Sequence, residues 1–504
     1  MKKTALLLMA ITILSKIIGF GREIVLSYYY GASNISDAYL ISTTIPGVIF
    51  SFVSSGLIAG YIPMYSSIFK SENKESANNF TSNLINLLLI VSLIIIGFSF
   101  IFSEAIVKLF ASGFDLETFN LTVKFTRVSL FAILFSGIVS IFSGYLQLKN
   151  NYIIPAIVGF PMNFILIISI IFSKEFGNYF LAYGYILAVA LQVFVMLPYM
   201  KKSDYIHKRI IKFKDEHIVK MIRMAVPIII GVSVNQINVL VDRTIASKIV
   251  VGGVSALNYA DKLNGFVQGI FVLSISTALY PMISKLASDN DMCGFKKLLK
   301  EAMLGVSILV IPAMMGITIF SSEIVSVLFG RGEFDKEAIE ITSSALFFYS
   351  FGMIGYGLRE LLSRAFYAIQ DTKTPMINAT IGVVTNIILN LILSKFLGIG
   401  GLALATSISA LLTTSLLIFS LKSKIDGYQI EGELVTLFKI VIASLIMGFI
   451  AKILNTLLYG YLGMTLALLI SIISAIIVYA VVIFFMRIAE VNDIIAKAKH
   501  IFDK

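Results

Sequence analysis

About fourteen apolar runs divide this chain, and each is long enough to cross the roughly 30 Å of hydrocarbon in a bilayer. Hydrophobic residues make up 58% of the 504 residues and charged residues only 14%, which is more apolar material than a water-soluble surface can hide. Continuous runs predict helices, because membrane strands show short alternating segments instead. The sequence therefore predicts an all-α polytopic membrane protein. The runs are 4–27, 38–61, 80–102, 125–147, 153–173, 180–200, 222–243, 258–281, 301–320, 341–365, 376–397, 401–421, 435–458 and 461–486.

An internal repeat with an offset of about 220 residues further limits the fold. Repeats of this kind in apolar chains are typical of transporters whose two halves rock about a central site. The repeat therefore predicts a tandem duplication. The matching pairs are Phe102–Phe110 with Phe320–Phe329, Pro63–Ser66 with Pro281–Ser284, and Pro155 with Pro375.

A basic segment at 201–221 separates two blocks of six predicted spans. We expect an N-terminal lobe at 1–200, a cytoplasmic linker at 201–221, a C-terminal lobe at 222–421, and two further spans with a cytoplasmic tail at 422–504. Because an even number of crossings separates the repeats, both lobes enter the membrane in the same orientation. A parallel pseudo-two-fold repeat is expected.

Most basic residues fall in loops on the side of the N-terminus, which predicts cytoplasmic N- and C-termini. The net charge of +11 is then an anchoring bias toward the cytoplasmic leaflet and not a sign of nucleic-acid binding. No metal-ligand spacing, Ser, His and Asp arrangement or P-loop is present in the sequence, so we expect a protein that is not an enzyme. Acids outside the spans, such as Asp115 and Asp335, are interpreted as solvated loop residues.

Charged side chains inside a span cost about 2.5 to 3.5 kcal/mol each, so they should face a cavity or a partner. Lys16, Arg22 and Glu23 form such a cluster in the first span. One interpretation places Lys16 and Arg22 in the lining of a substrate cavity. The alternative is a structural ion pair between Glu23 and either cation.

Four further charged residues are candidates for substrate binding. Asp37 precedes the second run and is either a substrate residue or a helix-capping acid. Lys262, Arg359 and Arg364 lie in the eighth and tenth spans, although Arg364 could instead extend to the cytoplasmic boundary. Basic residues from both lobes indicate an anionic substrate, and phosphate or pyrophosphate suits Arg and Lys donors.

A polar, mostly uncharged group is a candidate Na⁺ site. Asn386 and Asn390 share one face of the eleventh span, with Thr406 in the twelfth and Asp242 in the seventh. Their oxygens are suitable ligands for a hard cation. The alternative is that the Asn and Thr side chains only hydrogen-bond helices together.

Seven short sequence blocks together form a recognisable pattern: Ser15–Glu23, Gly31–Ala32, Ser36–Tyr39, Gly231–Ile237, Tyr259–Leu263, Phe366–Pro375 and Gly401–Ser407. This pattern resembles the MurJ family of lipid II flippases in the MOP (MATE-like) exporter superfamily. The resemblance implies a fourteen-helix, alternating-access fold in the bacterial cytoplasmic membrane. It also implies transport of undecaprenyl-pyrophosphate-linked disaccharide-pentapeptide to the outer leaflet for peptidoglycan synthesis. Membrane lipids would surround a functional monomer, with the cell-wall synthesis machinery as a candidate partner.

By motif position, Lys16, Arg22, Asp37 and Lys262 correspond to family residues important for head-group binding or gating. The family often has Arg where this chain has Lys16 and Lys262, which keeps the charge but loses the bidentate fork. A response to Na⁺ or to membrane potential is also implied.

One departure from the family pattern lies in the second span. Many members carry two Arg and an acid in the region where this chain has Phe50, Ser51 and Ser55. The alternatives are a flippase for another polyprenyl-linked glycan, of the teichoic acid or O-unit type, and a MATE-like drug/cation antiporter.

Overall fold

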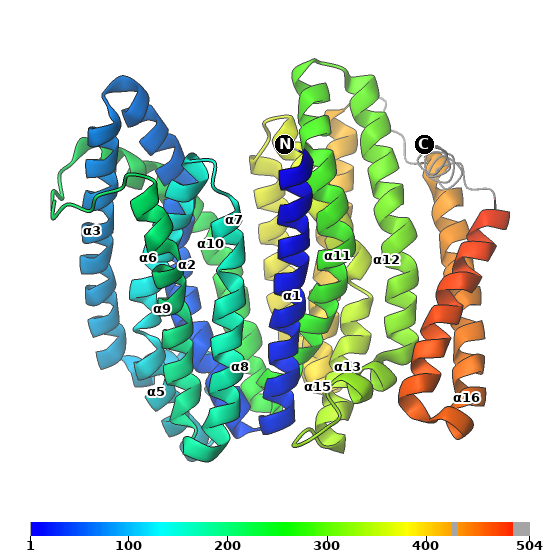
Figure 1. Ribbon diagram of the computed structural model, residues 1–504. Coiled ribbons are helices and arrows are strands. Elements are labelled where there is room, and N and C mark those ends of the chain that lie inside the picture. The colour runs from blue at the N-terminus through cyan, green and yellow to red at the C-terminus, as the bar shows by residue number, and fades with distance from the viewer. Residues whose placement is uncertain (1, 426–430, 487–504) are drawn as a thin grey trace. The chain divides into compact units, whose positions relative to one another are not determined.

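Every element that the structure describes is a helix, in a computed structural model that describes residues 2–425 and 431–486 (Figure 1). This confirms the all-α prediction. By its contacts the chain forms two compact units, one of residues 1–255 with 332–334 and one of residues 256–331 with 335–504. The helices up to α10 are α1 (Lys2–Tyr30), α2 (Asn34–Ser71), α3 (Lys74–Ile101), α4 (Ser103–Phe110), α5 (Leu116–Ser129), α6 (Ala132–Leu148), α7 (Ile153–Ile157), α8 (Gly159–Phe176), α9 (Tyr179–Lys202) and α10 (Glu216–Ile249). The later helices are α11 (Gly253–Ser288), α12 (Met292–Leu328), α13 (Lys336–Ser350), α14 (Met353–Ala368), α15 (Lys373–Lys424) and α16 (Glu431–Phe485).

The unit boundary after Ser255 differs from the predicted boundary at 201–221. The difference comes from α10, which packs extensively against α2 and so groups with the first unit. Packing does not test which helices descend from which repeat, so the predicted lobes stay a prediction. The predicted cytoplasmic tail lies largely outside the described residues.

The number of spans is lower than predicted when each helix is counted once. Among the described residues, seven helices are long and apolar enough to cross a membrane, or up to eleven if each of four bent helix pairs is one span. The predicted number of fourteen is therefore not confirmed.

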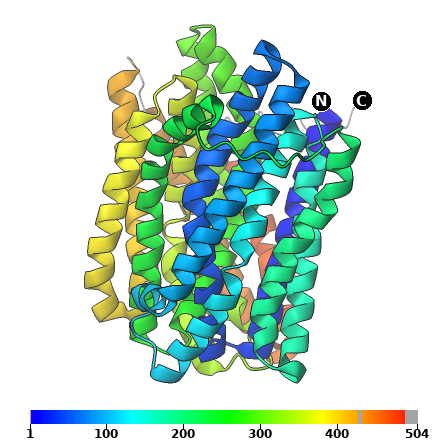
Figure 2. The ribbon, with the colours of Figure 1, turned by 90° about the vertical axis from the view of Figure 1, so that its left-hand side faces the viewer.

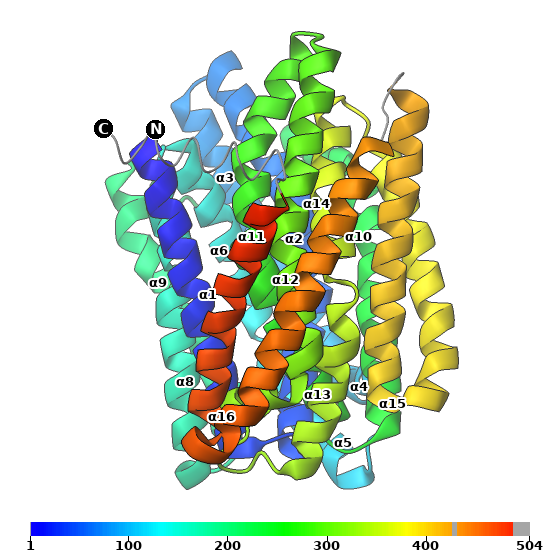
Figure 3. The same ribbon diagram turned by 90° about the vertical axis from the view of Figure 1, so that its right-hand side faces the viewer.

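Glycine breaks account for part of this difference. A straight helix of 52 or 55 residues would extend about 80 Å, far beyond a bilayer. α15 is broken at Gly398 (φ 56°) and α16 at Gly463 (φ 72°), a conformation that glycine adopts without a Cβ clash. Each helix thus consists of two legs, and those of α16 lie side by side (Figure 3).

The two units repeat the same local structure at the predicted offset. Phe102 interrupts the helix between α3 and α4, and Phe320 interrupts α12 with similar dihedral angles (φ −93° and −112°). Asp115 caps α5 and Asp335 caps α13, each accepting a hydrogen bond from the backbone N–H three residues later. Both acids are exposed and lie outside the helices, as expected of solvated loop residues, and each also caps the helix that follows it. The bend between α5 and α6 (42°) corresponds to that between α13 and α14 (47°).

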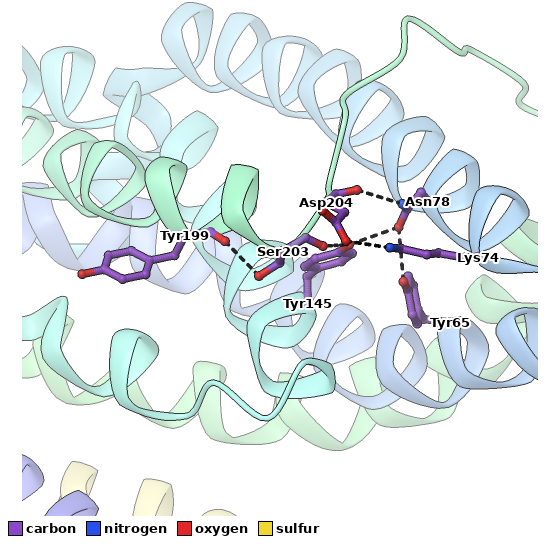
Figure 4. A network of polar contacts seen from close by, with 7 residues as sticks. All are labelled: Tyr65, Lys74, Asn78, Tyr145, Tyr199, Ser203 and Asp204. Carbon is purple, nitrogen blue, oxygen red and sulfur yellow. Dashed lines mark hydrogen bonds and ion pairs between the residues drawn. The ribbon is translucent and has the colours of Figure 1, made fainter.

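A polar network joins α2, α3, α6 and the residues that follow α9 (Figure 4). The Asn78 side chain on α3 accepts hydrogen bonds from the hydroxyls of Tyr65 and Tyr145, both at 3.2 Å. Lys74 pairs with Asp204 at 2.9 Å. Buried hydroxyls and amides need such partners, because an unpaired polar group loses its hydration without compensation. The network therefore ties the segment after α9 to α3.

That segment, residues 203–214, is here called the strap. It crosses the outer side of α3 (Figures 1 and 2), and its peptide groups bond to side chains of α3. Asn83 donates to the carbonyl of Lys212 at 3.1 Å and accepts from its N–H at 2.8 Å. Asn86 donates to the carbonyls of Lys208 (3.0 Å) and Ile210 (2.9 Å). Asparagine side chains thus replace the hydrogen bonds that an extended backbone would otherwise make to water.

Replacing Asn83 with Ala should lower stability by about 1 to 3 kcal/mol, because both peptide groups of Lys212 lose their partner. Thermal unfolding of the purified protein, followed by circular dichroism, measures the effect. Asn79→Ala is the matched control, since the Asn79 Oδ1 is buried with no hydrogen bond among the described residues. Equal melting temperatures for the two variants would contradict this account of the strap.

Candidate functional site

Arg22 and Glu23 form an ion pair in the middle of the first unit. Glu23 is 2% exposed, and the guanidinium of Arg22 also donates to Asn163 Oδ1 on α8 at 3.2 Å. A small cavity of about 70 Å³ lies beside this pair, with Tyr39 and Tyr185 in its lining. The geometry agrees with the ion-pair interpretation, and it also places both charges at a cavity. Each charge is compensated, as burial in a membrane protein requires.

Lys16 lies six residues earlier on α1, about 9 Å along the helix axis from Arg22. Its side chain is half-buried and has no hydrogen bond or ion pair to the described residues. An ammonium group without a protein partner keeps its full capacity to bind an anion. Of the two cations in the first-span cluster, Lys16 is therefore the one without a partner among the described residues.

Asp37 caps a helix, but not the helix that contains it. Ser33 and Ser36 form the capping box of α2, while the carboxylate of Asp37 accepts the N–H groups of Gly252 (3.0 Å) and Ser255 (2.7 Å) at the start of α11. The hydroxyl of Ser255 also donates to Asp37. Asp37 is 1% exposed, and the positive end of a helix stabilises its charge. Its predicted role in substrate binding is untested, but its oxygens are occupied here.

The predicted basic residues of the second unit have different surroundings. Lys262 on α11 is exposed and has no hydrogen bond or ion pair to the described residues. Arg364 on α14 pairs with Glu360 at 2.9 Å and donates to the carbonyl of Ser276 at 3.2 Å. Arg359 lies 4.8 Å from the ring centre of Tyr356. Like Lys16, Lys262 is thus without a partner within residues 2–425 and 431–486.

The predicted cation ligands come together only in part. Asn386 donates to Thr406 at 3.1 Å, and Asn390 donates to the Asn386 Oδ1 at 2.8 Å, so these three join the two legs of α15. Asp242 belongs to the first unit and accepts from Asn238 at 3.4 Å. The contacts within α15 are those of the helix-joining alternative. No group of three or more His, Cys, Asp or Glu suited to a metal occurs among the described residues.

An apolar cavity of about 470 Å³ opens in the second unit, where α11, α12 and α16 meet. Pro312 and Gly316 of α12 face it, as do Gly448 and Ala451 of α16. Almost all of its lining atoms are apolar, so water gains little there and a hydrocarbon chain is the matching ligand.

Comparison with known proteins decides the family. A family model described as lipid II flippase MurJ matches residues 26–473. The chain belongs to the MurJ family. It is 28% identical to the probable lipid II flippase MurJ of Thermotoga maritima over 491 residues, or 97% of each chain. The probable lipid II flippase MurJ of Vibrio cholerae is 29% identical over 431 residues, or 82% of each.

Solved structures agree with this family. A lipid II flippase MurJ in an inward closed conformation matches with a TM-score of 0.83 and 29% identity, over 95% of this chain and 98% of that chain. An inward-facing MATE-family multidrug transporter of the MOP superfamily matches with a TM-score of 0.71 and 15% identity, over 82% and 94%. The second match shows a shared fold alone. The predicted resemblance to MurJ proteins is confirmed.

Sequence reasoning offered Glu23 as a partner of Arg22 but missed Asn163. Asn163 lies in the fifth predicted span and is 8% exposed, and Tyr39 and Tyr185 are further elements of the same cavity. An asparagine inside an apolar run was the available signal, because a buried amide must find a partner. Its distance of 141 residues from Arg22 hid which partner it was.

Replacing Asp37 with Ala should lower stability by about 2 kcal/mol, because the first N–H groups of α11 lose their acceptor. Asp37→Asn should cost less, since asparagine keeps one cap oxygen. Melting temperatures of the purified variants test this order, with the exposed Glu117→Ala on α5 as the control. If Asp37→Ala melts no lower than the control, the capping role is refuted.

Proposed function

We propose that this MurJ-family protein is a lipid II flippase. It moves undecaprenyl-pyrophosphate-linked disaccharide-pentapeptide from the inner to the outer leaflet by alternating access. The observation that carries the proposal is the family match over residues 26–473, most of the chain. Support comes also from Lys16 and Lys262, which have no partners in the part of the chain that the structure describes and are suited to an anionic cargo. The teichoic acid or O-unit and drug/cation alternatives are not favoured, since the MATE-like neighbour shares only the fold.

The pyrophosphate is bound by basic side chains in this proposal. Lys16 offers an ammonium group that no acid among the described residues neutralises, and Lys262 does the same in the second unit. Arg22 would exchange part of its pairing with Glu23 for a phosphate oxygen. Charge-assisted bonds of this kind are stronger than neutral ones and offset the loss of hydration. The paired Arg364 and the stacked Arg359 are weaker candidates for the same role.

The polyprenyl tail takes a separate path. The 470 Å³ apolar cavity lined by α11, α12 and α16 is suited to a section of hydrocarbon chain. Holding the tail there keeps it out of water while the head group crosses. The two legs of α16 supply one wall, which gives the C-terminal spans a role in the proposal.

The proposed function also has a cellular location and an energy source. The protein acts in the bacterial cytoplasmic membrane with cytoplasmic termini, as a monomer that can work beside the cell-wall synthesis machinery. An inside-negative potential assists outward movement of negative charge by about 2.3 kcal/mol per charge per 100 mV. Coupling to Na⁺ through Asp242, Asn386, Asn390 and Thr406 is a further hypothesis, tested by transport with and without Na⁺.

In a strain depleted of its own lipid II flippase, supplying this protein should restore growth. The Lys16→Ala and Arg22→Ala variants should not restore it, although both remain inserted in the membrane. Without either cation, too little positive charge remains to offset the negative charge of the pyrophosphate inside the membrane. Lys16→Arg should support growth because it keeps the charge. Lys108→Ala, which removes an exposed cation on α4, is the control. Full growth of both alanine variants would refute the role of these two cations.

Filling the apolar cavity should slow transport without unfolding the protein. Gly316→Leu places a side chain into the cavity, and a Cβ there meets no atom within 4 Å. Gly305→Leu on the same helix also meets none, but does not line the cavity, so it is the matched control. In the same growth assay, only the Gly316→Leu variant should fail to restore growth. Equal growth of the two variants would exclude this path for the tail.

A further inference from the structure

The strap is a built surface and not a free loop. Asn83, which is 1% exposed, holds the Lys212 peptide from both sides. Tyr205 is 7% exposed and its hydroxyl contacts Ser82 at 3.1 Å. The Lys74 ammonium fixes Asp204 near the start of the strap. Because the backbone is held at several points, its side chains are arranged before any ligand arrives, which lowers the entropy cost of binding.

The side chains that the strap leaves exposed alternate between two kinds. Arg209, Lys212 and Lys214 are exposed cations. Among them lie two large apolar side chains, Ile211 at 54% and Phe213 at 63% exposed. A strap that met only water would gain nothing from exposing these apolar groups. Alternating cations and large apolar groups are typical of a surface that meets lipid headgroups.

The position of the strap on α3 agrees with that surface. The side chains that hold it end at Asn86. From Leu84 to Ile101 the helix is almost wholly apolar, and these residues span about 27 Å, close to the thickness of the hydrocarbon layer. The strap thus lies where this apolar stretch begins, on the outer side of α3 (Figure 2). Headgroups occupy that level of a bilayer.

We propose that the strap binds the anionic phospholipid headgroups of the leaflet at its end of the protein. Arg209, Lys212 and Lys214 contact the phosphates, while Ile211 and Phe213 enter the boundary between headgroups and acyl chains. The interaction fixes the segment that joins α9 to α10 to the membrane surface. This binding of headgroups does not require the transported substrate.

A tryptophan reporter tests this directly, because the chain contains no Trp. The full-length Phe213→Trp variant is placed in nanodiscs of phosphatidylcholine alone or mixed with phosphatidylglycerol. With the anionic lipid, we expect a blue shift of the emission and stronger quenching by lipids brominated near the headgroup. High salt should reverse both changes, because it screens exposed charges.

Charge variants separate lipid binding from simple apolar insertion. On the Phe213→Trp background, Arg209→Gln with Lys212→Gln should remove the response to anionic lipid. Lys108→Gln with Lys124→Gln removes the same charge from exposed residues of α4 and α5, and should leave the response intact. Ile211→Trp is a second reporter, used if the first variant does not fold.

Three results would overturn the proposal. Emission typical of water in every lipid mixture would show that the strap does not meet the bilayer. Equal quenching in neutral and anionic discs would show insertion without headgroup recognition. Loss of the response in both charge variants would show an effect of net charge alone. In the last two cases an acidic protein partner becomes the better explanation of the basic residues.

Discussion

The cost of placing charge in hydrocarbon is the constraint on which this structure depends. Charged residues of the first unit meet it in different degrees. Arg22 and Glu23 neutralise each other, Asp37 accepts backbone N–H groups at the start of a helix, and Lys16 has no partner among the described residues. The first two arrangements stabilise the fold. The third does not, and in the proposed function an anionic ligand compensates it. Lys262 of the second unit is exposed and also has no partner among the described residues.

The sequence was sufficient to predict the fold class, because long apolar runs leave helices as the available structure. It also predicted the repeat, and the two matched segments that it identified begin at corresponding helix breaks, Phe102 and Phe320. It did not predict the number of spans, since bent pairs and the glycine breaks within α15 and α16 depend on local backbone geometry. Nor could it predict that Asp37 caps a helix more than 200 residues away, or that Asn163 meets Arg22. Both contacts arise only from tertiary packing.

The fold of this chain does not by itself identify the cargo. A MATE-family drug transporter shares the arrangement of helices at 15% identity, while a MurJ structure matches at 29% over nearly the whole chain. A shared fold does not determine what is carried. The cargo is indicated instead by family membership, by the uncompensated lysines and by a 470 Å³ apolar cavity beside α16. An anionic head with a long hydrocarbon tail meets all of these conditions together.

The most direct test of the central claim is the amount of lipid II accessible at the outer face of the membrane when this protein is depleted from its own cells. If the protein is the flippase, labelled lipid II at the outer surface falls as the protein is lost, accumulates in the inner leaflet, and returns when the unaltered chain is supplied. Undiminished lipid II at the outer surface after depletion would contradict the account.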